Sequence, residues 1–214
     1  MEVNTSDRIG TGQLTCLRRC PHCGISRPQI VKAHIADPIQ PLDGSAVSRW
    51  AVYRCTSCSG WITAKGQPGS TIANPLIVEV FPGLARAHED LPEIARKYLD
   101  QAMETLGSPD ASGVMSGSAV DAMLKALGYE KGSVYERIDQ AVEGHKITAD
   151  MGEWAHSVRL GSNRPRHADK DNPHVSREEA QRSVEFAEAL GNFLFVLTAR
   201  IERGIKSAQE GPES

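Results

Sequence analysis

Two short stretches decide the fold of the first third of this sequence: residues 20–24 read CPHCG, and residues 55–60 read CTSCSG. Each stretch places two cysteines three positions apart, a spacing at which a tight turn can direct both sulfurs toward one metal ion. The 31 residues between the two pairs are enough for a strand and a loop that bring the chain back. We therefore predict a zinc ribbon with one Zn²⁺ per chain. Its predicted ligands are Cys20, Cys23, Cys55 and Cys58.

Four thiolates complete the tetrahedral coordination of zinc, so we expect this ion to be structural and not catalytic. A redox-active cysteine pair is the alternative, but two copies in one small module favour metal. The fifth cysteine, Cys16, is either an alternative ligand or, in the simpler interpretation, an ordinary buried thiol. His22 lies inside the first cysteine pair, and we expect its side chain to point outward.

The composition is that of an ordinary soluble protein, with 40% hydrophobic residues and a net charge of −3. No segment approaches the roughly 20 apolar residues that cross a bilayer, and the first ten residues contain no apolar signal segment. We therefore expect a cytoplasmic protein with no membrane contact. In that reducing compartment, an odd number of cysteines favours metal binding over disulfides.

The pattern of apolar residues changes once along the chain. Up to residue 82 it indicates short strands, at 49–55, 60–66 and 75–82. Beyond that point it indicates helices, at 91–107, 118–130, 133–145, 147–160 and 176–204. The predicted fold class is α+β, a small β-rich zinc ribbon followed by an antiparallel helical bundle. We assign a disordered N-terminus (1–14), a zinc-ribbon module (15–82), a helical bundle (83–205) and a disordered tail (206–214).

Two of the predicted helices begin with a capping box, in which a serine and a glutamate three residues later satisfy free backbone amides. The two boxes pair Ser133 with Glu136 and Ser176 with Glu179. We expect the large aromatic residues of the helical part to anchor its core; they are Trp154, Phe186, Phe193 and Phe195.

The zinc module is moderately basic, with eight Lys/Arg and four Asp/Glu in residues 1–70. Its basic residues include Arg18, Arg19, Arg27, Lys32, Arg49 and Arg54, and its aromatic residues include Trp50, Tyr53 and Trp61. One interpretation is a nucleic-acid reader, in which the aromatic rings stack on bases. The other, which the small size of the module favours, is that the rings form its core and the arginines are solvated.

A polar segment, residues 158–174, joins two of the predicted helices. It could bind phosphate or assist RNA cleavage, with His167 as general acid or base and an arginine stabilising the developing charge. The alternative, which the residue types favour, is a connector whose charges face water. The candidate catalytic residues are His167, Arg159 and Arg164, and the candidate nucleic-acid or ligand-binding residues are Asn163, Arg164, Arg166 and His167.

Several stretches between Cys20 and Ile201 together resemble the domain-of-unknown-function family numbered 4145. They are CPHCG, YRCTSC, LPEIARKYLDQA, MGEWAHSVRLGSNRPRHAD and VSREEAQRSVEFAEALGNFLF. That family occurs in bacteria, alone or fused to restriction-type and other defence-associated proteins. The helical part is similar to the HEPN superfamily (higher eukaryotes and prokaryotes nucleotide-binding). The resemblance implies an all-helical domain, frequently dimeric, which in some branches is a metal-independent ribonuclease.

Active HEPN ribonucleases carry an arginine, usually followed by a polar residue, with four to six residues between that arginine and a histidine. Asn163 and His167 match the polar residue and the histidine, but Ser162 stands where the arginine would be. Our leading hypothesis is therefore a non-catalytic protein that binds nucleic acid or a partner protein in a prokaryotic setting such as phage defence. The helical bundle, through the apolar residues 186–197, could also form a homodimer. The alternative is a HEPN-type ribonuclease with a degenerate motif centred on His167.

Overall fold

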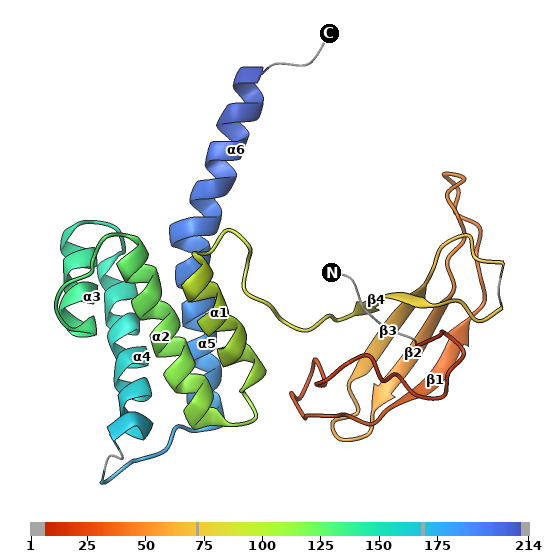
Figure 1. Cartoon of the computed structure of the whole chain (residues 1–214), viewed down its shortest axis with the longest axis horizontal. Helices are drawn as coiled ribbons and strands as arrows, with labels where there is room; N and C mark the ends of the chain where they lie inside the picture. The colour runs from red at the N-terminus through yellow and green to blue at the C-terminus, as the bar shows by residue number, and fades with distance from the viewer. Residues whose placement is uncertain (1–6, 72, 168–169, 211–214) are drawn as a thin grey trace. The chain divides into compact units, whose positions relative to one another are not determined.

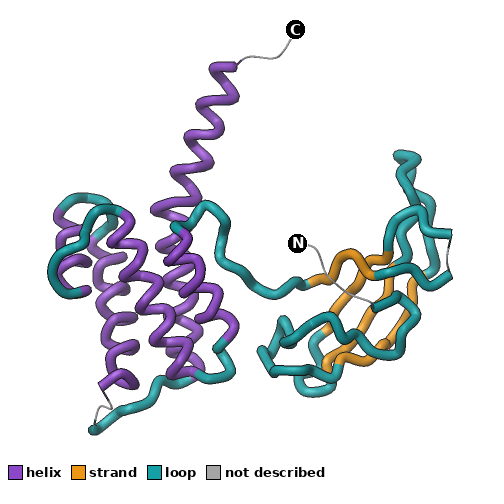
Figure 2. The backbone as a smooth tube through the Cα atoms, in the orientation of Figure 1, coloured by secondary structure: helices purple, strands orange, loops and turns teal. Residues whose placement is uncertain are grey.

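The computed structural model describes residues 7–71, 73–167 and 170–210. The chain folds into two compact units, with the division between Ala85 and Arg86 (Figure 1). The first unit contains a β-sheet and the second is helical (Figure 2), so the fold class is α+β. None of the helices in the described ranges has the length and apolarity needed to cross a membrane.

The sheet of the first unit is an antiparallel meander in the order β1-β2-β3-β4. Its strands are β1 (Ile30–Ala36), β2 (Trp50–Cys55), β3 (Trp61–Gly66) and β4 (Ile77–Phe81). Buried and accessible residues alternate along β2 and β3 because successive side chains of a strand point to opposite faces. One face of the sheet is therefore packed, and the other, which we call the open face, is accessible.

The packed face is covered by the segment that precedes β1. Ile9 and Leu14 are each 1% exposed and lie in one apolar cluster with Tyr53 and Ile62. The amide of Ile9 donates to the carbonyl of Pro75 at 3.0 Å, and the hydroxyl of Tyr53 donates to the carbonyl of Ile9 at 3.0 Å. The assignment of residues 1–14 to a disordered N-terminus is thus wrong for residues 7–14; residues 1–6 lie outside the described ranges. Two isolated apolar residues are too few to show a periodic pattern, yet they are enough to cover the sheet.

The second unit is a helical bundle (Figure 1). Its helices are α1 (Glu93–Glu104), α2 (Pro109–Ala126), α3 (Val134–Glu143), α4 (Ala149–His167), α5 (Arg177–Gly191) and α6 (Leu197–Glu210), with a π-helical turn η1 (Asn192–Val196) between α5 and α6. Both predicted capping boxes are confirmed, at the starts of α3 and α5.

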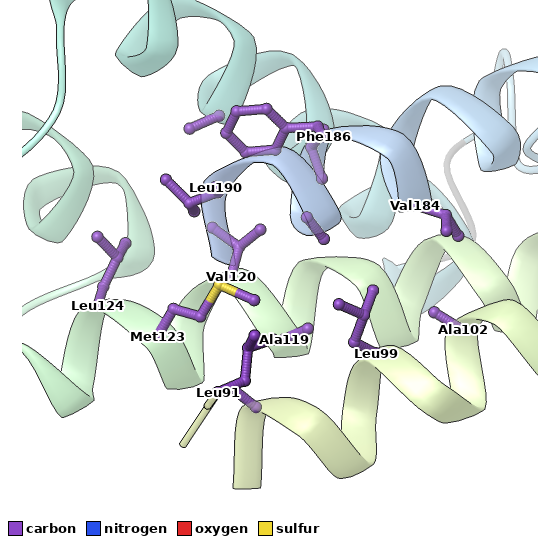
Figure 3. Packing of buried hydrophobic residues seen from close by; sticks show 14 of the residues in the cluster. Leu91, Leu99, Ala102, Ala119, Val120, Met123, Leu124, Val184, Phe186 and Leu190 are labelled. Carbon is purple, nitrogen blue, oxygen red and sulfur yellow. The ribbon is translucent and has the colours of Figure 1, made fainter. Parts of the chain in front are cut away.

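The core of the bundle forms where α1, α2 and α5 meet (Figure 3). Leu99 of α1, Met123 of α2 and Leu190 of α5 are at most 1% exposed. Phe186 is also buried, as predicted, and the ring of Trp154 lies 4.9 Å from it. The prediction is wrong for Trp154 and Phe193, which are 42% and 44% exposed because they lie at the edge of the bundle.

Three helices are longer than the sequence pattern indicates. α2 begins at Pro109 and not at residue 118, because its first turns pack through small residues such as Ser112 and Gly113 that give no apolar signal. α4 continues to His167, so residues 158–167 of the predicted polar connector are helical. α6 continues to Glu210, so the prediction of a disordered tail is wrong for residues 206–210, and residues 211–214 lie outside the described ranges.

Candidate metal centre and ligand-binding surfaces

The two cysteine pairs adopt the same local structure. In the first pair the amide of Cys20 donates to the carbonyl of Ile25 at 3.0 Å, and in the second the amide of Cys55 donates to the carbonyl of Gly60 at 3.0 Å. Each turn also carries one residue with left-handed backbone, Gly24 with φ 72° and Ser59 with φ 60°. Both stretches are therefore knuckles, tight turns that present two sulfurs on the same side.

The knuckles bring four sulfurs together. The sulfurs of Cys20, Cys23, Cys55 and Cys58 all lie within 4.8 Å of one another, close enough to hold one metal ion. The sulfurs of Cys20 and Cys58 are 3.8 Å apart. A regular tetrahedron of sulfurs about 2.3 Å from a zinc ion has edges of about 3.8 Å, so this separation fits zinc. The amides of His22 and Gly60 each donate to a sulfur at 3.4 Å, which stabilises negative charge there.

His22 connects the two knuckles. Its ring nitrogen Nε2 lies 2.7 Å from the carbonyl oxygen of Trp61, and its ring covers Gly60. A Cβ at position 60 would lie 2.4 Å from Cδ2 of His22, so a larger residue there would displace this ring. His22 is exposed and lies outside the four-cysteine group, as expected, and its ring packs across the second knuckle.

The thiols of the centre differ in acidity. Burial raises the pKa of Cys20 to about 12, against the opposing effect of the amides of Cys23 and His22. Burial also opposes ionisation of Cys55, but hydrogen bonds from the amides of Cys58 and Ser57 lower its pKa to about 7. Because the four sulfurs are close together, their full ionisation requires a compensating cation.

Cys16 is not a member of the four-cysteine group. It packs against the apolar core of the first unit, and its amide donates to Asp7 at 2.9 Å. This position corresponds to the simpler of the two interpretations of Cys16, an ordinary partly buried thiol.

The aromatic residues of the first unit lie on both faces of the sheet. Tyr53 is 0% exposed and belongs to the core, whereas Trp50 and Trp61 are 36% and 56% exposed. The two tryptophans belong to the open face, as does Phe81, whose ring centre is 5.9 Å from that of Trp50. The interpretation that the aromatic residues form the core is thus correct for Tyr53 and wrong for the two tryptophans.

Cationic side chains lie beside both tryptophans. Arg54 pairs across the sheet with Trp61, and its Cζ lies 5.9 Å from the centre of that ring. Lys65 pairs with Trp50, and its Nζ lies 5.8 Å from that ring centre. We call these five residues the aromatic platform: Trp50, Arg54, Trp61, Lys65 and Phe81.

The candidate residues of the polar segment lie on different sides of α4. Arg159, Asn163 and Arg166 lie at helical spacing on one side, where all three line a cavity. Arg164 lies on another side, and its guanidinium contacts Glu179 of α5 at 2.6 Å. His167 is the exposed last residue of the helix. It lies eight positions after Arg159, about 12 Å along the helix axis, so these two side chains are not adjacent.

Ser162, at the position of the HEPN arginine, is 3% exposed. It lies where α4 crosses α2, and a Cβ on Gly117 of α2 would be 2.5 Å from its Oγ. The short serine side chain at this position therefore lies at a close approach of the two helices.

Residues that the sequence did not indicate lie near Arg159. Tyr135 of α3 lines the same cavity, and its ring centre is 4.5 Å from that of His156. His156 in turn contacts Asp139 through Nε2 at 2.9 Å. These residues come from two helices and share no sequence motif, so only the packing of α3 on α4 reveals them.

The chain is thus a two-unit α+β protein, in which a module whose four cysteines could hold one metal ion is joined to a helical unit. A family model described as "Domain of unknown function (DUF4145)" matches residues 100–208, about half of the chain. The chain belongs to this family. No curated protein and no solved structure matches the chain.

Proposed function

We propose that this protein binds single-stranded nucleic acid on the aromatic platform and is not an enzyme. The observation that carries this proposal is the pair of accessible tryptophans, each beside a cation on the open face of the sheet. Aromatic rings that stack on bases, together with cations that contact phosphates, are the usual means of binding single strands without sequence preference. The remaining parts of the proposal are a zinc-ribbon first unit and a HEPN-like second unit. A role in prokaryotic defence rests on the family resemblance alone.

The spacing of the tryptophans suits two separate bases. Trp50 pairs with Lys65 and Trp61 with Arg54, so the two rings are four residue pairs apart along β2 and β3. At about 3.3 Å per residue, this separation is about 13 Å. One strand of nucleic acid can therefore place one base on each ring, while Arg54 and Lys65 contact the phosphates.

The proposed metal is zinc, and its role in this function is structural. Cys55 is the last residue of β2, and Cys58 lies in the turn that leads to Trp61. A zinc ion bound by both knuckles would hold this turn, and with it the position of Trp61 on the open face. Four thiolates leave zinc no vertex for water, so the centre has no catalytic position.

The test is a fluorescence titration of a labelled oligothymidine with the full chain. Trp50→Ala and Trp61→Ala should each weaken binding by about 1–3 kcal/mol, roughly 5- to 150-fold, because each removes one stacking surface. Arg54→Gln should weaken binding and reduce its dependence on salt. Trp154→Phe, in the helical unit, is the matched control and should bind as the wild type does. Unchanged binding in both alanine variants would contradict the proposal.

The competing proposal, a HEPN-type ribonuclease centred on His167, can be tested on the same protein. Incubation with a structured RNA should give no cleavage, because no arginine occupies the motif position and Arg164 pairs with Glu179. Cleavage that disappears in His167→Ala would establish the enzyme and overturn the non-catalytic assignment.

We further propose that the protein forms a homodimer through α6. Leu197, Ile201 and Ile205 recur every four residues along one stripe of this helix and are 48%, 53% and 54% exposed. Within its own unit, α6 packs as an element only against η1 (Figure 1), so the described part of the unit leaves this stripe uncovered. In a homodimer, the same stripe on the second copy of the chain would cover it, because a two-fold interface pairs a surface with itself.

A further inference from the structure

A large cavity lies inside the helical unit, between α1, α2, α3 and α4. Its volume is about 1060 Å³, the size of a site for a small organic molecule. Apolar side chains from all four helices contribute to its lining: Ile94, Tyr98, Val120, Val134 and Val158. The proposed binding of nucleic acid to the first unit makes no use of this cavity.

The acidic side chains of the cavity are already paired. Asp121 contacts Lys125 and Arg137, each at 2.7 Å. Glu93 contacts Lys97 at 2.6 Å. These carboxylates are therefore occupied by cations, and the charge that remains on the lining is positive.

That positive charge comes from Arg159 and Arg166. Within the described ranges neither guanidinium forms an ion pair with a carboxylate. The Nε of Arg159 is buried without a hydrogen-bond partner, and its Cζ lies 5.3 Å from the ring centre of Tyr135. A buried donor without an acceptor is destabilising, and an anion bound in the cavity could accept this hydrogen bond.

The lining combines polar and apolar side chains. Arg159, Asn163 and Arg166 span two turns of α4, about 10 Å, and form a polar strip. Val120 of α2 and Ile94 of α1 contribute apolar side chains. A ligand that contacts both kinds of side chain has an anionic group and an apolar body.

We propose that this cavity is a binding site for a small organic anion. Its carboxylate or phosphate contacts Arg159, with Asn163 or Arg166 as the second polar contact. Its apolar body lies against the valine and isoleucine side chains of α1, α2 and α4. A carboxylate and a phosphate can both accept a hydrogen bond from Arg159, so the experiment tests one ligand of each kind.

The experiment is isothermal titration calorimetry of the full chain with decanoate, decyl phosphate and decyltrimethylammonium, which share one alkyl chain. At least one anion should bind with one molecule per chain, and the cation should bind at least about tenfold more weakly, since its charge is repelled. The stronger of the two anions identifies the preferred anionic group. Binding of neither anion, or equal binding of the cation, overturns the proposal.

Two variants assign the binding to this cavity. Arg159→Gln should weaken anion binding by about tenfold or more, because it removes a charge-assisted hydrogen bond. Arg200→Gln removes the same charge from an exposed position on α6 and should change the affinity less than about twofold. If circular dichroism shows that Arg159→Gln does not fold, Ala122→Phe, which places a ring in the cavity, should cause the same loss. A folded variant of either kind that binds the anion as the wild type does overturns the proposal.

Discussion

Cys55 belongs both to the metal centre and to the strand that carries the aromatic platform. It ends β2, is 0% exposed and follows directly after Arg54. Its amide is bonded to the carbonyl of Gly60, the residue before Trp61. A change at this one residue should therefore affect metal binding and the open face together.

We expect one zinc ion per chain, measured by elemental analysis of the purified protein. Cys55→Ser should lose the ion and unfold the first unit, because structural zinc stabilises such modules by roughly 10 kcal/mol or more. The loss of structure is measured by the fluorescence of Trp50 and Trp61. Cys16→Ser is the matched control and should retain the ion, since Cys16 lies outside the four-cysteine group. Retention of zinc in Cys55→Ser would refute the proposed centre.

At the scale of elements, two glycines near Ser162 of α4 have opposite surroundings, one crowded and one open. Where α4 crosses α2, Gly117 leaves room for the buried Ser162. One residue before Ser162, the place where a Cβ of Gly161 would lie has no atom within 4 Å from the described residues outside its chain neighbours and its own helix backbone. The first glycine is thus required by packing, whereas the second only adds flexibility to a helix.

Two alanine substitutions test this difference. Gly117→Ala should lower the free energy of unfolding by about 1–3 kcal/mol, because the new methyl group overlaps Ser162. Gly161→Ala should raise it by about 0.5–1 kcal/mol, because alanine is the better helix former and loses less entropy on folding. Both values are obtained from urea denaturation followed by circular dichroism. If both variants changed the free energy of unfolding in the same direction, α2 and α4 would not approach each other as closely as described.

The start of α2 is tied to the segment before α5 through Asp110. Its carboxylate accepts hydrogen bonds from the amide of Val175 and from Nδ1 of His174, each at 2.7 Å. The amide of Val175 and then His174 hold the pKa of Asp110 below its usual value. The ionised carboxylate is therefore more stable in the folded than in the unfolded chain. Its contribution is present above the usual aspartate pKa, about 3.9, and is lost as the pH falls through the folded pKa.

Asp110→Asn should reduce the stability of the helical unit at pH 7 by about 1 kcal/mol. The difference from the wild type should shrink as the pH falls below about 4, because the wild-type carboxyl then becomes neutral as well. Urea denaturation at pH 7 and at low pH measures both differences. Glu143→Gln, at an exposed position on α3, is the control and should leave the curve unchanged. A pH-independent difference would contradict the role assigned to the Asp110 charge.

At the scale of the whole molecule, each unit has an apolar core of its own. The proposed functions are correspondingly separate, with the metal centre and platform in the first unit and the anion site and α6 stripe in the second. A local substitution in one unit can therefore remove the function of that unit without directly affecting the function of the other unit.

The homodimer is tested by measuring the molar mass with light scattering as the protein elutes from a size-exclusion column. The wild type should have twice the chain mass of 23.2 kDa. Ile201→Lys with Ile205→Lys should give the single-chain mass, because two charges would be buried at the interface. Gln209→Lys adds a charge at another exposed position of α6 and should leave the dimer intact. A wild-type mass of one chain would refute the dimer.

The sequence by itself determined the features that depend on local spacing. Two cysteines three residues apart define a knuckle, and a serine followed by a glutamate three residues later defines a helix start, without reference to any distant residue. The α+β class followed in the same way, from a change in the period of apolar residues.

The tertiary structure alone decided which side chains are covered. Trp50 and Tyr53 lie on one strand and look alike in the sequence, yet only the packed face is covered, by Ile9 and Leu14 from a segment with no pattern. The cavity likewise combines Tyr135 with Arg159 from separate helices, and its size depends on how closely α2 approaches α4. Burial is a property of contacts between distant segments, and the spacing of residues along the chain does not record it.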